Sequence, residues 1–224
     1  MTARTVGARK NALIGTAPTV RYTPWSDPSW EIWAHASAAR LCKRVDRYFD
    51  LHPEHVFSEV RKNGQANYYA WLKSVTVPVY MQDRYPTIPA SVRFPKERIL
   101  AEFPRYFSST FAWMVALALT EGATHLGVFG IHYQFGSEYA EQRPGAEFWL
   151  GLAAGRGVQI VNPEGSPLLR EPARLYGYES HTPDLYAARK AQFRKDKALK
   201  TVKAFDPSQL RPATKPLPAD WLTV

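Results

Sequence analysis

Cysteine and long apolar runs are scarce in this chain of 224 residues. Cys42 is the only cysteine, which excludes an internal disulfide and a paired-cysteine metal site and fits a reducing compartment. The longest apolar run covers residues 111–119, whereas a membrane-spanning helix needs about 20 residues. Residues 1–11 are polar and basic with no apolar segment behind them, so we expect no signal peptide. These absences predict a soluble, cytoplasmic protein that does not enter a membrane.

Two common catalytic motifs are also missing. The sequence has no Gly-x-x-x-x-Gly-Lys-Ser/Thr loop and no Gly-x-Ser-x-Gly turn, so no motif favours P-loop nucleotide hydrolysis or serine-hydrolase chemistry. Apolar residues are plentiful by contrast, since 45% of the chain is hydrophobic and 13% is aromatic. At this length, such a composition is enough for the core of one compact domain.

Positive charge is unevenly distributed along the chain. The formal net charge is +9, yet residues 11–185 hold 17 basic and 17 acidic side chains. Residues 186–224 contain nine lysines and arginines against three aspartates. Clustered basic side chains favour contact with a polyanion such as DNA, and a solubilising tail is the alternative. We divide the chain into a flexible basic arm (1–10), a folded domain (11–181) and a basic, proline-containing extension (182–224).

Strand and helix patterns alternate through the folded domain. Short apolar or β-branched runs predict strands, while apolar residues three or four apart and prolines at helix starts predict helices. This alternation predicts an α/β fold with a mostly parallel sheet. The expected strands are residues 12–14, 31–36, 44–51, 77–81, 124–129 and 158–161, and the expected helices are residues 64–73, 96–103 and 111–119 and two that open at Pro53 and Pro144.

Two segments place small and hydroxylated residues at the ends of elements. In the first, a strand runs into Gly-Thr-Ala-Pro-Thr at residues 15–19, a turn whose glycine and hydroxyls suit a phosphate. An ordinary tight turn is the alternative. In the second, Ser108, Ser109 and Thr110 are candidate caps of a helix that is apolar on almost every side and is therefore expected to be buried.

These segments resemble those of the bacterial sialyltransferases that use a cytidine-monophosphate sugar, and of the related pterin-pyrophosphokinase-like domains. Residues 15–19 are similar to their Gly-x-Gly-Pro-Ser turn. Residues 108–132 are similar to their Thr-Ser-Gly-x-x-Met helix with the following strand and Gly-Ile-Asp, and residues 158–169 to their late strand with a Pro-x-Ser-Leu-Leu exit. The resemblance implies one Rossmann-like, glycosyltransferase-like domain over residues 11–181 that binds a nucleotide or nucleotide-sugar donor.

The chain also resembles uncharacterised tailed-phage proteins. The shared stretches are Phe-Asp-Leu-His at 49–52, Pro-Val-Tyr-Met at 78–81, Glu-Tyr-x-x-Gln-Arg at 138–143 and Gly-Leu-Ala-x-Gly-Arg-Gly at 151–157. This likeness implies no particular reaction. It implies that the cytoplasm in question is that of a phage host.

Three histidines stand at the ends of expected strands. Ligands of open α/β sheets bind beyond the carboxyl ends of the strands, where the strand order reverses. His35, His52 and His132 occupy such ends, where the resembling sialyltransferases have Asn, Asn and Asp. Histidine there can bind phosphate, act as an acid or base near neutral pH, or bind a metal, and a structural hydrogen bond is the alternative.

The expected catalytic loop departs from the resembling enzymes. Their His-Ser-Lys loop, which supplies the general base, has no counterpart between Gly136 and Gly157, so sialyl transfer is not expected. We interpret His132 or Glu138 as the general base and Arg143 as the group that stabilises the leaving phosphate. The candidate nucleotide-binding residues are Gly15, Thr16, Ala17, Pro18, Thr19, His35, His52, Ser108, Ser109, Thr110, Gly130 and Gln142, and no metal ligand is assigned.

The functional hypothesis is the transfer of a group, with a sugar favoured, from a nucleotide-activated donor. DNA bearing modified bases, held by the basic ends, is one candidate acceptor. The first alternative is a non-catalytic protein that binds a nucleotide or nucleic acid, because a fold alone does not confer activity. The second is phosphate or pyrophosphate chemistry that depends on a divalent metal. The sequence leaves the oligomeric state open.

Overall fold

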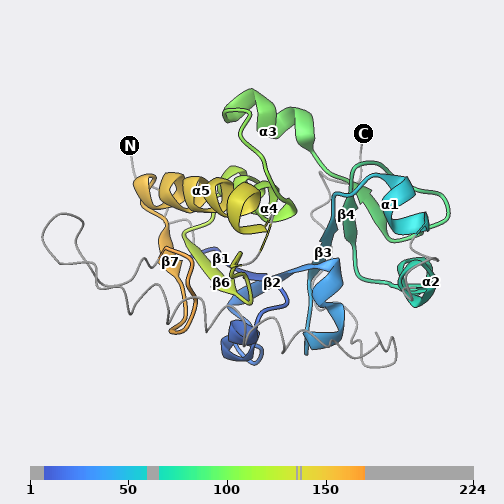
Figure 1. Cartoon of the computed structure of the whole chain (residues 1–224), viewed down its shortest axis with the longest axis horizontal. Coiled ribbons are helices and arrows are strands. Elements are labelled where there is room, and N and C mark those ends of the chain that lie inside the picture. Colours follow the sequence, from blue (N-terminus) through green and yellow to red (C-terminus); the bar gives the residue numbers. More distant parts are fainter. Residues whose placement is uncertain (1–7, 60–65, 135, 137, 170–224) are drawn as a thin grey trace, which may run out of the picture.

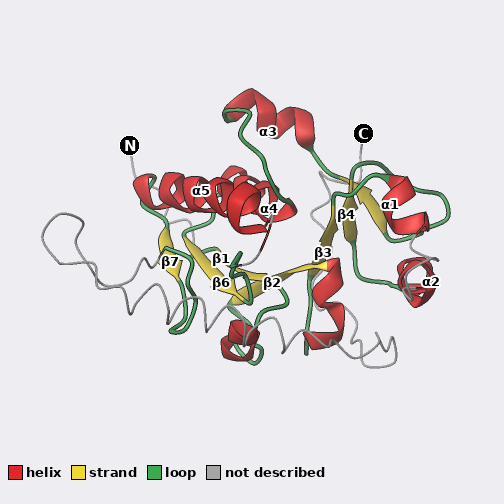
Figure 2. Cartoon of the chain, viewed as in Figure 1, coloured by secondary structure: helices red, strands yellow, loops and turns green. Residues whose placement is uncertain are grey.

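A parallel β-sheet forms the centre of the described part of the chain. The computed structural model describes residues 8–59, 66–134, 136 and 138–169. Within them, seven strands form one sheet in the order β5-β4-β3-β2-β1-β6-β7, and every neighbouring pair is parallel. Helices flank the strands (Figure 2), so the expected α/β fold with a mostly parallel sheet is confirmed. Residues 1–7 of the arm, residues 170–181 and the extension 182–224 lie outside the described residues.

Strands and helices have the following bounds. The strands are β1 (Lys10–Ile14), β2 (Trp30–His35), β3 (Arg47–Asp50), β4 (Val79–Met81), β5 (Ser91–Arg93), β6 (His125–Phe129) and β7 (Gln159–Val161). The helices are η1 (Pro18–Tyr22), η2 (Ala36–Leu41), α1 (Glu54–Glu59), α2 (Ala66–Ser74), α3 (Lys96–Glu102), α4 (Thr110–Thr120), η4 (Glu138–Gln142) and α5 (Arg143–Gly155). Here η1 and η2 are 3-10 helices and η4 is a π-helix. None of the helices in this part of the chain is long and apolar enough to cross a membrane.

Three parts of the fold differ from the sequence pattern. The sequence does not predict β5, because its three residues lie between two prolines and show no periodicity. β3 begins at Arg47 rather than at residue 44, and Asp46 just before it bonds Ile32 through both its backbone N–H and its carboxylate. The fold also begins before residue 11. The carbonyl of Arg9 accepts hydrogen bonds from the backbone N–H groups of Thr124 and His125.

Two apolar layers cover the sheet, one on each face. Side chains alternate along each strand, so that Leu13 packs on the face with α3, α4 and α5, while Ile14 packs on the face with η2, α1 and α2. Figure 1 shows α4 and α5 on one side of the strands. α4 is buried as expected because nearly all its residues are apolar, and the hydroxyl of Ser109 caps it by accepting a hydrogen bond from Ala112 N–H.

A buried ion network closes the amino edge of the sheet. The guanidinium of Arg47 lies 2.8 Å from a carboxylate oxygen of Glu31 and 2.7 Å from one of Glu121. Arg9 also pairs with Glu121. Burial raises the pKa of Glu121 above its ordinary value even though Arg47 opposes the shift. The network therefore anchors the edge opposite to the carboxyl ends of the strands.

Candidate functional site

The order of the strands reverses between β1 and β6. From β1 the chain builds the sheet through β2 and β3 in one direction, and it later returns to place β6 and β7 on the other side. In open parallel sheets, the crevice beyond the carboxyl ends at such a reversal is the usual ligand site. Ile14 and Phe129, the last residues of β1 and β6, are paired in register, so the two strand exits lie side by side.

Two glycines meet backbone to backbone at this reversal. A Cβ atom on Gly15 would lie 2.4 Å from the carbonyl oxygen of Gly130, and one on Gly130 would lie 2.6 Å from the carbonyl oxygen of Gly15. Gly130 also has a positive φ of 72°. The N–H groups of Gly15 and Ala17 donate to the carbonyls of Phe129 and Gly130, at 2.8 Å each. The close backbone contact between the two strand exits therefore explains why both positions need glycine.

The side chains of Thr19 and His132 connect the same two strand exits by hydrogen bonds. The hydroxyl of Thr19 accepts a hydrogen bond from Gly130 N–H at 2.9 Å and lies 2.9 Å from Nε2 of His132. Thr19 is buried, whereas Thr16 in the same turn is exposed. The hydroxyl of Thr19 is therefore occupied by hydrogen bonds within the fold, whereas the exposed hydroxyl of Thr16 is accessible to a ligand.

The start of α4 and the start of α5 adjoin the β6 exit. The ring of Phe111 contacts that of Tyr133, with centroids 6.2 Å apart, and Tyr133 has an unusual positive φ of 48°. The hydroxyl of Ser108 donates to the carbonyl of Gln142 at 3.4 Å. The structure thus brings together three of the segments that the sequence selects, namely the turn at 15–19, the cap of α4 and the exit of β6.

Arg143 serves the fold at the start of α5. Its side chain is buried, and its guanidinium donates to a carboxylate oxygen of Glu147 at 2.9 Å and to the carbonyl of Pro167 at 3.0 Å. The same Glu147 oxygen accepts from Leu169 N–H. Arg143 therefore holds the loop after β7 against α5, and its role on a phosphate stays a prediction. Glu138 has its backbone in η4, and its side chain lies outside the described part of the chain.

A second polar group lies at the neighbouring exits of β2 and β3. Asp50, the last residue of β3, accepts from Nδ1 of His52 at 2.6 Å through one carboxylate oxygen and from the hydroxyl of Tyr68 at 2.5 Å through the other. The ring of His35 stands edge-on to that of His52, with centroids 6.0 Å apart. Both histidines are expected from the sequence, whereas Asp50 and Tyr68 are not. The Asp-Leu-His spacing at the strand end was the available signal for the aspartate.

The ionisation of this group follows from burial and from its hydrogen bonds. Burial alone would raise the pKa of Asp50, but hydrogen bonds from His52 and Tyr68 bring it below the ordinary value. The hydrogen bond to Asp50 raises the pKa of His52, against the effect of its partial burial. Loss of hydration lowers the pKa of His35, although the Asp50 carboxylate opposes this. Near neutral pH, His35 is therefore neutral, while the Asp50 carboxylate favours the protonated form of His52.

His35 has a structural task of its own. Its Nδ1 accepts a hydrogen bond from the backbone N–H of Ser37 at 3.3 Å and lies 2.7 Å from the hydroxyl of that residue. This contact caps η2 at its start. One nitrogen of His35 therefore makes a structural hydrogen bond, which was the alternative to a site role. The nucleotide-binding role of His35 stays a prediction.

The residues that the structure describes include no group of three or more His, Cys, Asp and Glu side chains arranged to hold a metal ion. A largely apolar hollow of about 430 Å³ opens beside the ends of β6 and β7, away from Asp50 and His52. Its lining residues are Tyr22, Pro24, Trp30, Phe129, Val161, Pro163 and Glu164.

Comparison with known proteins gives weak likenesses to solved structures. No family model and no curated protein matches the chain. The sialyltransferase CstII from Campylobacter jejuni in complex with cytidine-5'-monophosphate is 10% identical, with a TM-score of 0.44 over 81% of this chain and 99% of that one. Its complex with CMP-3FNeuAc gives 12% identity and a TM-score of 0.47, over 81% and 98% of the two chains. An alpha-2,3-sialyltransferase from Campylobacter jejuni in apo form is 13% identical, with a TM-score of 0.46 over 84% and 95%. At these identities the likeness concerns the path of the chain, and the ligands named are those of the Campylobacter enzymes.

Proposed function

We propose that this chain is a glycosyltransferase-like enzyme that transfers a group, specifically a sugar, from a nucleotide-activated donor. The observation that carries the proposal is the reversal of strand order at β1 and β6, with polar and ionisable side chains at the exits of β1, β2, β3 and β6 along one edge. The sequence resemblance of residues 15–19, 108–132 and 158–169 to nucleotide-sugar enzymes supports the same assignment.

The donor nucleotide occupies the β1/β6 side of the edge in this proposal. Thr16 supplies an exposed hydroxyl there, and His132 supplies an imidazole fixed by Thr19. Because Thr19 engages Nε2 of His132, we give His132 the task of positioning a donor phosphate. The sequence suggests Arg143 as the phosphate ligand and His132 or Glu138 as the base, and both roles stay predictions. The other candidate contacts remain Gly15, Ala17, Pro18, His35, His52, Ser108, Ser109, Thr110, Gly130 and Gln142.

The acceptor is the finer part of the proposal. Residues 186–224 carry nine lysines and arginines against three aspartates, so they suit a polyanionic acceptor, and DNA with modified bases is the one we propose. This segment lies outside the described residues. The support for a DNA acceptor is therefore its charge alone.

Thermal-shift measurements with nucleoside mono- and diphosphates and nucleotide sugars test the proposal. A ligand at about 100 times its Kd stabilises the folded state by about 2.7 kcal/mol. We expect at least one nucleotide to raise the Tm of the wild-type chain, and Thr16→Ala and His132→Ala to reduce that rise. The matched controls are Thr76→Ala and His125→Ala, which change residues at the amino edge of the sheet and should keep the full rise.

The same panel separates the proposal from its alternatives. Release of free nucleotide from a bound nucleotide sugar supports transfer. Binding without release favours the non-catalytic nucleotide-binding protein. Cleavage of a pyrophosphate only when Mg²⁺ is added favours the metal-dependent alternative. If no nucleotide shifts the Tm, the proposed function is wrong.

A further inference from the structure

The geometry points to His52 as the general base of the proposed transfer, with Asp50 as the positioning residue that orients it. This inference rests on the proposed function, because it assigns a base to that reaction. It moves the base from the β6 exit, where the sequence places it, to the exit of β3.

The hydrogen bond between the two side chains sets the tautomer of the imidazole. An ionised carboxylate can only accept, so the 2.6 Å contact requires Nδ1 of His52 to carry a proton and donate it to Asp50. In the neutral ring, the lone pair then belongs to Nε2. This is the arrangement in which a histidine accepts a proton from a hydroxyl group.

Asp50 is itself held in place by several donors. The backbone N–H of His52 donates to one carboxylate oxygen at 3.1 Å, and the hydroxyl of Tyr68 donates to the other. The Asp50 side chain is only 3% exposed. A carboxylate that is buried with its oxygens bonded in this way has little freedom to turn, so it fixes the plane of the His52 ring.

His52 differs from the other two histidines of the edge in what its ring nitrogens do. Nε2 of His132 is engaged by Thr19, and Nδ1 of His35 caps η2. Within the described part of the chain, the contacts of His52 leave Nε2 open, and its side chain is 49% exposed. Of the three, His52 is therefore the one that combines a fixed tautomer with access for an acceptor.

The position of His52 suits a donor bound at the reversal. Neighbouring strands lie about 4.8 Å apart, so the exit of β3 is roughly 10 Å from that of β1. A phosphate and a sugar ring together span such a distance. A donor phosphate held at the β1 exit thus brings its sugar near the exits of β2 and β3, where His52 faces the acceptor.

The proposed step moves a proton to His52 and the sugar to the acceptor oxygen. The acceptor O–H gives its proton to Nε2 of His52 while the acceptor oxygen forms a bond to the anomeric carbon of the donor sugar. The bond between that carbon and the phosphate oxygen breaks, and its electron pair leaves with the nucleotide. The imidazolium, stabilised by Asp50, later releases the proton to water. With water in place of the acceptor, the same step hydrolyses the donor.

The pH dependence follows from the groups that face His52. These are Asp50 on β3, His35 at the end of β2, and Tyr68 on α2 through its bond to Asp50. Because Asp50 raises the pKa of His52, the rate should rise as the pH passes through a value above 6.5. In Asp50→Asn this acidic limb should move to lower pH, since the carboxylate that raised the pKa is gone.

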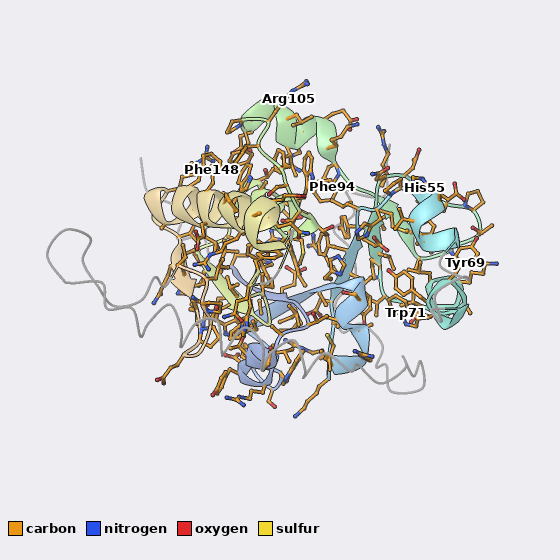
Figure 3. All side chains as sticks on the ribbon, in the orientation of Figure 1. His55, Tyr69, Trp71, Phe94, Arg105 and Phe148 are labelled. Carbon is orange, nitrogen blue, oxygen red and sulfur yellow. The ribbon has the colours of Figure 1, made fainter. Side chains whose placement is uncertain are left out.

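The experiment measures nucleotide release from the nucleotide sugar that raises the Tm most, with water as acceptor, in the full chain. We expect His52→Gln to lower the rate between about 100-fold and 10,000-fold, as for other general bases, while the nucleotide still raises the Tm through its contacts at the exits of β1 and β6. His55→Gln is the matched control. His55 is exposed on α1, only three residues further on (Figure 3), and its variant should react like the wild type.

Asp50→Asn supplies a readout that a merely structural role would not change. The asparagine amide can donate to Nδ1 of His52 and thereby favour the Nε2–H tautomer, which ¹⁵N imidazole NMR of the folded variant detects. A large loss in His52→Gln, with a shifted pH limb and a changed tautomer in Asp50→Asn, supports the inference. Full activity in His52→Gln overturns it and leaves the proposed function standing. A wild-type chain that releases no nucleotide from any sugar donor overturns both.

Discussion

At the scale of single residues, the contributions of Asp50 and His52 to the stability of the fold are lost at opposite ends of the pH range. His52 has a pKa raised from 6.5, so its contribution to stability is complete below 6.5 and is lost as the pH rises through the raised value. Asp50 has a pKa lowered from 3.8, so its contribution is present above 3.8 and is lost as the pH falls through the lowered value. Both contributions are therefore present between these ranges, in mildly acidic solution.

This linkage predicts a pH-dependent effect of His52→Gln on the free energy of unfolding. The loss should be larger at about pH 5 than at about pH 9, because the protonated imidazole gains from the Asp50 charge, whereas the neutral imidazole keeps only its hydrogen bond to Asp50. Because the His52 side chain is 49% exposed, solvent screening keeps the loss below about 1 kcal/mol. Urea unfolding at both pH values measures it, with His55→Gln as control. A loss that does not change with pH would contradict the linkage.

At the scale of the elements, the close contact between the exits of β1 and β6 depends on Gly15 and Gly130. Gly130→Ala forces a side chain into a positive φ of 72° and against the carbonyl of Gly15. We expect a loss of about 1–3 kcal/mol in the free energy of unfolding, measured by chemical denaturation. Gly15→Ala should cost a similar amount, so neither variant is a clean probe of ligand binding.

A glycine with open space around it provides the control for this contact. Gly151 lies on α5, and apart from its chain neighbours and the nearby helix backbone no atom lies within 4 Å of the position its Cβ would take. Gly151→Ala should stabilise the chain by about 0.5–1 kcal/mol, because alanine favours the helix. If Gly130→Ala were as well tolerated as Gly151→Ala, the close contact of the two strand exits would be wrong.

The elements also show how far sequence reasoning reaches. Segments with a strong pattern, such as the apolar helix α4 and the strands β1 and β6, are predicted to within two residues. β5 is not, because it is short and owes its place to pairing with β4. His35, His52 and His132 stand at strand ends as expected. Tyr68 is missed because no local pattern encodes its hydrogen bond to Asp50, which joins α2 to β3. Asp50 is missed although the Asp-Leu-His spacing at the strand end is a local signal for it.

At the scale of the whole molecule, the two edges of the sheet have different tasks. Arg47 is buried at the amino edge between Glu31 and Glu121. Arg47→Met removes the buried cation between the two carboxylates and leaves the partly exposed Arg9 as their remaining partner. We therefore expect a loss of up to about 3–5 kcal/mol in the free energy of unfolding, measured by urea denaturation. Arg93→Met, which removes an exposed pair with Glu97, should cost less than about 1 kcal/mol. Equal losses in the two variants would contradict the structural role of the network.

The basic extension carries a separate prediction. If residues 186–224 hold a DNA acceptor, each phosphate contact adds about 0.9 to the slope of log affinity against log salt concentration. A chain ending at residue 185 should bind DNA more weakly and with a flatter slope, measured by fluorescence anisotropy. Equal affinity and equal slope in the truncated chain would show that the extension makes no such contacts.

The central claim is that the carboxyl edge of the sheet binds the donor nucleotide, and amide shift mapping by NMR tests it most directly. On addition of the nucleotide that raises the Tm most, we expect the largest shifts at Thr16, Gly130 and His132, with smaller ones at His35 and His52. Thr124 and His125, at the amino end of β6, should remain unchanged. Shifts confined to the amino edge, around Thr124 and His125, would contradict the claim.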